Sequence, residues 1–179
     1  MESLKKLFFN ESLRHWHFEV LVKECKLSRE RVNYFLKILL KEKFILRVKL
    51  RAKMPYYVAN RELAAFREQK RLWGLQELSR NGLFEYIRSL SGVTTAIIFG
   101  SFARGDWNKS SDVDIFIYGP VRDFDKKLFE KRLKRPLQLF LFDDSKTLKQ
   151  ELDPGILPNI VKGFNITGNL QPFTVSIDA

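Results

Sequence analysis

The chain has 179 residues, of which 45% are hydrophobic and 30% are charged. This length suits one domain or two small ones of roughly 80–100 residues each, and its 16 Phe and three Trp residues exclude global disorder. No apolar run approaches the roughly 20 residues that a membrane helix needs, and the N-terminus does not resemble a secretory signal. Cys25 has no second cysteine to pair with. We therefore expect a cytoplasmic protein without a membrane partner.

The positive charge is concentrated in the first half of the chain. Residues 1–80 contain 19 Lys and Arg against nine Asp and Glu, whereas residues 81–179 contain 13 against 12, within a total net charge of +11. This asymmetry indicates two modules, and the first has the charge of a protein that faces a polyanion. A basic surface without a specific partner is the alternative.

Three helices are predicted at the start of the chain. Apolar residues at helical spacing indicate helices over residues 4–9 and 18–25, and a third from the predicted N-cap Ser28 to about residue 41. The third helix has one apolar face. Its opposite face carries Arg29, Arg31, Asn33, Tyr34 and Lys37.

A β-ribbon is predicted next. From residue 46 to residue 53 apolar and basic residues alternate, which predicts a strand with one basic face. That face consists of Arg47, Lys49, Arg51 and Lys53. Pro55 interrupts the pattern, and residues 56–58 predict a return strand.

Three helices followed by a ribbon are the element order of a winged helix-turn-helix, which we assign to residues 1–59. In such a module one helix enters the major groove of duplex DNA and the ribbon neutralises phosphates. The polar residues of the third helix and the four basic residues of the ribbon are therefore the candidate DNA-binding residues. Protein docking or dimerisation is the alternative use of this fold, and the sequence leaves a homodimer open.

A helix over residues 60–80, starting at the predicted N-cap Asn60, is expected to link this module to a second one over residues 81–179. Asn81-Gly82 is a turn signal at the boundary. A helix over residues 83–90 and a buried strand over residues 93–99 should follow.

The stretch after that strand carries most of the chemical information. Gly100-Ser101 leads from the strand into a short helix, where backbone N–H groups and a hydroxyl can meet phosphate oxygens. Asp112 and Asp114 then occupy one face of the next strand. Two neighbouring carboxylates repel unless a cation lies between them, which predicts a divalent metal. The alternative is that Ser111 caps a turn and both Asp side chains are only solvated.

These residues resemble the signature of the DNA polymerase β-type nucleotidyltransferases, in the compact form called minimal nucleotidyltransferases. The resemblance covers roughly residues 82–168 and includes Gly-Ser, Ala-Arg-Gly and Ser-Asp-x-Asp. The matching positions are Gly100, Ser101, Ala103, Arg104, Gly105, Ser111, Asp112 and Asp114. A winged helix before such a domain is similar to predicted archaeal two-domain proteins. The expected fold class is thus α/β in the α+β sense, a winged helix-turn-helix followed by a small mixed-sheet nucleotidyltransferase domain.

The resemblance implies roles for these residues. Gly100, Ser101, Arg104 and Ser111 would bind the nucleotide, an NTP with ATP as the expected one. Asp112 and Asp114 would be catalytic and would bind Mg²⁺ or Mn²⁺. The family's third carboxylate is expected on the next core strand, over residues 136–142, but the inward polar residue there is Gln138. Asp143 and Asp144 could substitute for it only with a different register.

The resulting hypothesis is a Mg²⁺-dependent enzyme that moves a nucleoside monophosphate from an NTP to a hydroxyl of a protein or a nucleic acid. The resemblance implies that a HEPN-type toxin protein is a candidate acceptor. A DNA-binding regulator or antitoxin with a nucleotide-sensing or inactive domain is the second hypothesis. A scaffold that pairs with another subunit is the third.

Overall fold

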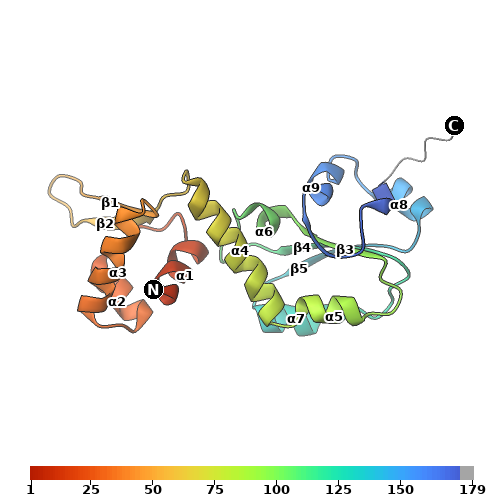
Figure 1. The fold of residues 1–179 in the computed structure, drawn as a ribbon, viewed down its shortest axis with the longest axis horizontal. Helices are drawn as coiled ribbons and strands as arrows, with labels where there is room; N and C mark the ends of the chain where they lie inside the picture. The colour runs from red at the N-terminus through yellow and green to blue at the C-terminus, as the bar shows by residue number, and fades with distance from the viewer. Residues whose placement is uncertain (174–179) are drawn as a thin grey trace. The chain divides into compact units, whose positions relative to one another are not determined.

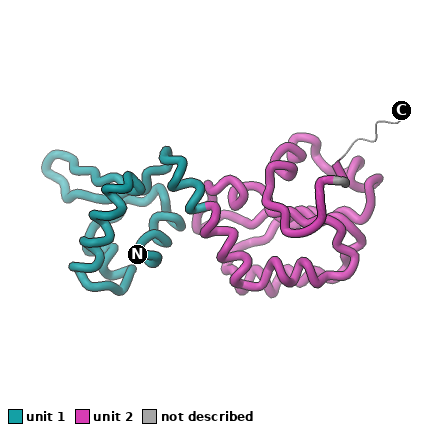
Figure 2. The backbone as a smooth tube through the Cα atoms, in the orientation of Figure 1, with its two compact units in different colours: residues 1–70 teal, residues 71–179 magenta. Residues whose placement is uncertain are grey.

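A computed structural model describes residues 1–173, and the chain divides into two compact units, Met1–Lys70 and Arg71–Ala179 (Figure 2). The first unit contains α1 (Glu2–Asn10), α2 (Phe18–Cys25), α3 (Arg29–Lys41), β1 (Ile45–Val48) and β2 (Tyr56–Ala59). Helix α4 (Ala64–Arg80) runs across the boundary. The second unit contains α5 (Leu83–Ser89), β3 (Thr95–Phe99), α6 (Gly100–Arg104), β4 (Val113–Tyr118), α7 (Lys126–Leu133), β5 (Leu137–Phe142), α8 (Ser145–Glu151), α9 (Leu157–Val161), β6 (Phe164–Thr167) and the 3-10 helix η1 (Gln171–Phe173).

The three predicted N-terminal helices are present at the expected places. Ser28 is the N-cap of α3, and its hydroxyl accepts a hydrogen bond from the Arg31 N–H at 3.3 Å. The apolar face of α3 is inside the unit, where Val32, Leu36 and Leu39 are buried. The sequence predicts this helix correctly because its apolar residues recur at helical spacing on one face, and such a face is stable when it is buried.

The ribbon is shorter than predicted. Strand β1 ends at Val48 and pairs with β2 in an antiparallel register from Ile45–Ala59 to Val48–Tyr56. Residues 49–55 form the connecting loop, in which Ala52 has a left-handed backbone (φ +59°). The prediction of one strand over residues 46–53 is therefore wrong, because the chain turns before the alternation ends.

A third segment extends this small sheet. Trp16, between α1 and α2, forms an isolated antiparallel bridge with Tyr57, and the two backbones exchange hydrogen bonds of 2.9 and 2.8 Å. The Trp16 side chain is buried and meets Phe8 of α1 edge to face. Aromatic contacts among Phe9, Phe44 and Phe66 complete this core. The hairpin is thereby held to α1 and to the chain before α2.

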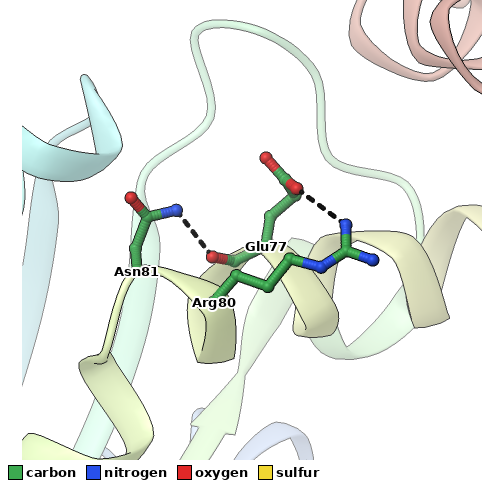
Figure 3. Close-up of polar contacts among 3 residues, drawn as sticks. All are labelled: Glu77, Arg80 and Asn81. Carbon is green, nitrogen blue, oxygen red and sulfur yellow. Dashed lines mark hydrogen bonds and ion pairs between the residues drawn. The ribbon is translucent and has the colours of Figure 1, made fainter.

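The linking helix also differs from its prediction at the start. It begins at Ala64, and the side chain of Asn60 donates instead to the backbone carbonyl of Lys43 at 2.8 Å. Its end agrees with the prediction. There the Asn81 side chain donates to the Glu77 carbonyl at 2.8 Å and Arg80 pairs with the Glu77 carboxylate at 3.3 Å (Figure 3). Gly82 then turns the chain with a φ of +80°.

The second unit is built on a mixed four-stranded sheet with the order β5-β4-β3-β6. Strands β4 and β6 both pair antiparallel with β3, and β4 and β5 run parallel. Strand β3 is buried along its whole length, as expected for the central apolar run. The parallel pair brings the N-terminal ends of β4 and β5 to the same end of the sheet.

Helices cover both faces of this sheet, with α5 and α7 on one side and α8 and α9 on the other (Figure 1). On the second side, Leu148 of α8 and Ile160 of α9 pack in one buried cluster with Phe99, Phe116 and Phe142. Asp114 shares the face of Phe116 by alternation but lies nearer the start of β4. No helix of residues 1–173 has the length and apolar character to cross a membrane.

Candidate functional site

The site begins at the turn between β3 and α6. Gly100 has a φ of +64°, and a Cβ built there would collide with the carboxylate of Asp114. The backbone N–H of Ser101 hydrogen-bonds to that carboxylate. The Ser101 hydroxyl is buried and has no hydrogen-bond partner within the described part of the chain. The turn thus combines a close approach between its backbone and the Asp114 carboxylate with a buried hydroxyl that has no hydrogen bond. Buried hydroxyls seldom lack a hydrogen bond.

We expect Gly100→Ala to destabilise the second unit by roughly 3 kcal/mol or more, because it adds both backbone strain and a collision. The matched control is Gly82→Ala. Gly82 also has a positive φ of +80°, but its Cβ would meet only Arg132 at an ordinary 3.6 Å. That variant should lose about 1–2 kcal/mol from strain alone. Urea unfolding measures both, and equal losses would show that the contact with Asp114 does not limit residue 100.

Three polar side chains converge at the start of β4 and β5. Asp112 immediately precedes β4, and Asp114 pairs in register with Phe99 of β3 on one side and Gln138 of β5 on the other. The amide orientation that satisfies hydrogen bonding places the Gln138 nitrogen 3.0 Å from Asp114 Oδ1 and 3.3 Å from Asp112 Oδ2. The sheet register confirms that Gln138 lies beside the carboxylates, but its side chain is exposed rather than inward.

The surroundings of Asp114 disfavour the ionised form of its carboxyl group. Burial, followed by the neighbouring Asp112 carboxylate, raises its pKa from the ordinary 3.8 to about 6, although Arg104 and the Ser101 N–H oppose the shift. Desolvation and like charge both disfavour the ionised form. A cation placed between the carboxylates would offset both penalties.

This perturbation predicts a pH dependence of stability. The pKa of Asp114 is higher in the folded than in the unfolded protein. Ionisation of Asp114 therefore lowers the stability of the fold, and protonation restores that stability. Without divalent cations, the free energy of unfolding should therefore rise as the pH falls from above 6 toward 4. Urea midpoints of the wild type and Asp114→Asn, compared at about pH 7.5 and about pH 5, isolate this contribution. An identical pH dependence in both proteins would rule it out.

The other two predicted nucleotide-binding residues have partners in the loop before β4. Arg104 is exposed and pairs with Asp106 at 3.0 Å. The Ser111 hydroxyl accepts a hydrogen bond from the Asn108 N–H at 2.9 Å, and so closes the turn. Both residues therefore make contacts within the segment that leads into Asp112.

Arg135 is the residue that sequence analysis did not identify. Its guanidinium donates to three backbone carbonyls of this loop: Asn108 at 2.5 Å, and Lys109 and Ser111 at 3.2 Å. It also lies 5.1 Å from the ring centre of buried Trp107. From sequence it belongs to a run of basic residues with no pattern to distinguish it. Only the parallel pairing of β4 and β5 brings it under the loop.

Asp143 and Asp144 do not join the carboxylates. They follow β5, five and six residues beyond Gln138, which is about 16 to 20 Å along an extended strand. Asp143 is exposed, and the Asp144 carboxylate caps α8 by accepting from the N–H groups of Lys146 and Thr147, both at 2.8 Å. Among the described residues there is no group of three or more His, Cys, Asp or Glu that could hold a metal. Gln138 is thus the third polar member of the site.

The candidate DNA-binding residues of the first unit lie on two surfaces. Arg31, Asn33, Tyr34 and Lys37 are exposed on α3, and Lys49, Arg51 and Lys53 are exposed in the loop after β1, where Arg47 is the last exposed strand residue. Arg29 is engaged differently. Its guanidinium pairs with Glu19 of α2 at 2.5 Å and lies over the Phe18 ring. The prediction for Arg29 is thereby the weakest on this surface.

Residues 80–152 match the family model of the nucleotidyltransferase domain. The matched segment is less than half of the chain, but it includes β3, α6, β4 and β5, and with them every residue of the site above. The mixed sheet fits such a domain. Residues 80–152 are therefore similar to a nucleotidyltransferase domain, and general nucleotidyl transfer is the class of chemistry that this similarity supports. Neither a curated protein nor a solved structure matched the chain.

Proposed function

We propose that the second unit is a nucleotidyltransferase dependent on Mg²⁺ or Mn²⁺, which moves a nucleoside monophosphate from an NTP, with ATP as the expected one, to a hydroxyl of a protein or a nucleic acid. The observation that carries this proposal is the convergence of Asp112 and Asp114 beside the Gly100–Ser101 turn. The family match to residues 80–152 supports the same class of reaction.

The residues present fit a divalent cation. Two carboxylates converge with one amide, and Mg²⁺ in nucleotide sites is typically held by one or two carboxylates together with substrate phosphates. The desolvated Asp114 has the most to gain from a positive ligand. Asp112 and Asp114 would hold the cation, which when bound neutralises charge on the phosphates and on the reacting oxygen.

The chain's own groups would position the nucleotide. Gly100 would offer its backbone to the phosphates, and its lack of a side chain leaves room for the Asp114 carboxylate against the same turn. The unpartnered Ser101 hydroxyl can donate to a phosphate oxygen. Arg104 is exposed and can exchange its surface partner Asp106 for a phosphate. Ser111 and Arg135 keep the loop before Asp112 in place.

A second candidate function follows from Gln138. A carboxylate at this position could accept the proton of an attacking hydroxyl, but an amide cannot act as a base. This favours the alternative of a DNA-binding regulator or antitoxin whose nucleotidyltransferase domain senses nucleotide without turnover. In either case, a HEPN-type protein is a candidate partner, and its hydroxyls are candidate acceptors.

For the first unit we propose a winged helix-turn-helix that binds duplex DNA. Its three helices, the hairpin and the bridge of Trp16 to Tyr57 support this fold. Helix α3 would contact the major groove through Arg31, Asn33, Tyr34 and Lys37, and the hairpin would contact phosphates through Arg47, Lys49, Arg51 and Lys53. A homodimer on a palindromic site is compatible with this arrangement.

The test of the enzymatic proposal is transfer of label from α-phosphate-labelled NTPs to candidate protein and RNA acceptors. Label that appears only with Mg²⁺ or Mn²⁺, and in an acceptor-dependent manner, supports the proposal. NTP binding without transfer to any acceptor would favour the sensing alternative. Label that forms equally in a chelator would contradict both.

A further inference from the structure

Gln138 takes the place of a cation between the two carboxylates. Its amide is within hydrogen-bond distance of both Asp112 and Asp114, at 3.3 and 3.0 Å. The charge of Arg104 and the N–H of Ser101 act on Asp114, whereas the Gln138 amide reaches both carboxylates. The amide nitrogen is therefore the group that links the two carboxylates in the cation-free protein. A residue that stands so close to both metal-binding candidates must move or change its role when a cation arrives.

We propose that Gln138 is a switchable ligand: in the cation-free protein its –NH₂ group bridges Asp112 and Asp114, and in the bound state a half-turn of the amide presents its oxygen to the cation. This inference rests on the proposed function, since it concerns the same cation. It assigns to Gln138 a neutral oxygen contact in place of the third carboxylate.

The geometry makes the exchange easy. The oxygen and nitrogen of a carboxamide have nearly the same size and position, so a half-turn changes the chemistry of the contact without changing its shape. The terminal torsion of Gln is broad and roughly two-fold. Gln138 is exposed at the start of the edge strand β5, so packing does not lock its amide. The backbone position is fixed by the register with Asp114.

The switch has a consequence for cation affinity. Three carboxylates would repel one another strongly without a cation and would bind it tightly. Two carboxylates and an amide are partly satisfied without it, since the amide donates to both. This chain should consequently bind a divalent cation with lower affinity than a site of three carboxylates would, and with less rearrangement of its carboxylates.

The experiment measures Mn²⁺ binding to the full chain by electron paramagnetic resonance, without nucleotide. Gln138→Met keeps the length but removes both polar atoms, and should weaken binding about tenfold. Gln138→Glu restores a carboxylate and should tighten binding beyond the wild type. Unchanged or tighter binding in Gln138→Met would overturn the proposal. Because the side chain is exposed, both variants should fold, which circular dichroism verifies.

Nuclear magnetic resonance provides a second readout that does not depend on affinity. The side-chain –NH₂ signals of Gln138, assigned by their loss in Gln138→Met, should shift on Mg²⁺ addition as their hydrogen bonds to the carboxylates break. Signals that stay in place while Mg²⁺ binds would overturn the proposal.

The control variant separates this inference from the proposed function. Asp112→Asn combined with Asp114→Asn should abolish Mn²⁺ binding. If the wild type binds Mn²⁺ and the double variant does not, but Gln138→Met equals the wild type, only the role of Gln138 fails. If the wild type binds no Mn²⁺, the metal-dependent function fails with it.

Discussion

Asp114→Asn is expected to lower the Mg²⁺-dependent transfer of label from an NTP by about 100-fold or more. The substitution keeps the shape of the side chain and removes one of the two carboxylates that would hold the proposed cation. The remaining Asp112 and the Gln138 amide would hold a divalent cation weakly. The transfer rate at saturating NTP, measured over a range of Mg²⁺ concentrations, tests this expectation.

Asp143→Asn is the matched control, because it removes the same charge from an exposed position beyond the end of β5. It should keep wild-type transfer. A second measurement guards against loss of folding: at about pH 7.5 Asp114→Asn should be more stable than the wild type, since it removes an ionised group that opposes folding. An Asp114→Asn variant that is stable and transfers label at the wild-type rate would remove the carboxylate pair from the mechanism.

The four basic residues of the hairpin have the second largest expected effect. Replacing Arg47, Lys49, Arg51 and Lys53 together by Ala should weaken duplex DNA binding roughly 100-fold at moderate salt. Each lost phosphate contact should also lower the slope of log affinity against log salt by about 0.9. Fluorescence anisotropy across a salt series measures both quantities, and the loss should be similar for unrelated DNA sequences.

A charge-matched variant of the second unit is the control. Lys126, Lys127, Lys131 and Lys134 are exposed in or just after α7, and their replacement by Ala removes the same net charge. That protein should retain nearly all of its DNA affinity. Equal losses in the two variants would mean that net charge, rather than the hairpin, attracts DNA. Arg29→Ala should have a small effect, because Glu19 already pairs with this side chain.

Much of the secondary structure of this protein could be predicted from helical and strand periodicity in its sequence. The amphipathic pattern of α3 and its Ser28 cap are encoded within a few residues, so local physics is enough to predict them. The same applies to Asp112 and Asp114, because a two-residue spacing on an extended chain places both on one face. That Gln138 is the polar residue on the matching face of β5 was also predictable from alternation, whereas its pairing with Asp114 depends on the parallel register.

Tertiary structure decided what depends on residues far apart in the chain. The ribbon ends at Val48 because the chain turns through a left-handed residue and Trp16 pairs with the returning strand, and periodicity contains neither fact. Arg135 reaches the loop of Asn108 only because β4 and β5 lie parallel. The raised pKa of Asp114 and the buried, unpartnered Ser101 hydroxyl arise only in the folded protein. A sequence pattern predicts on which face of a helix or strand a side chain lies. The desolvation and the hydrogen bonds of that side chain depend on the groups that surround it in the folded protein.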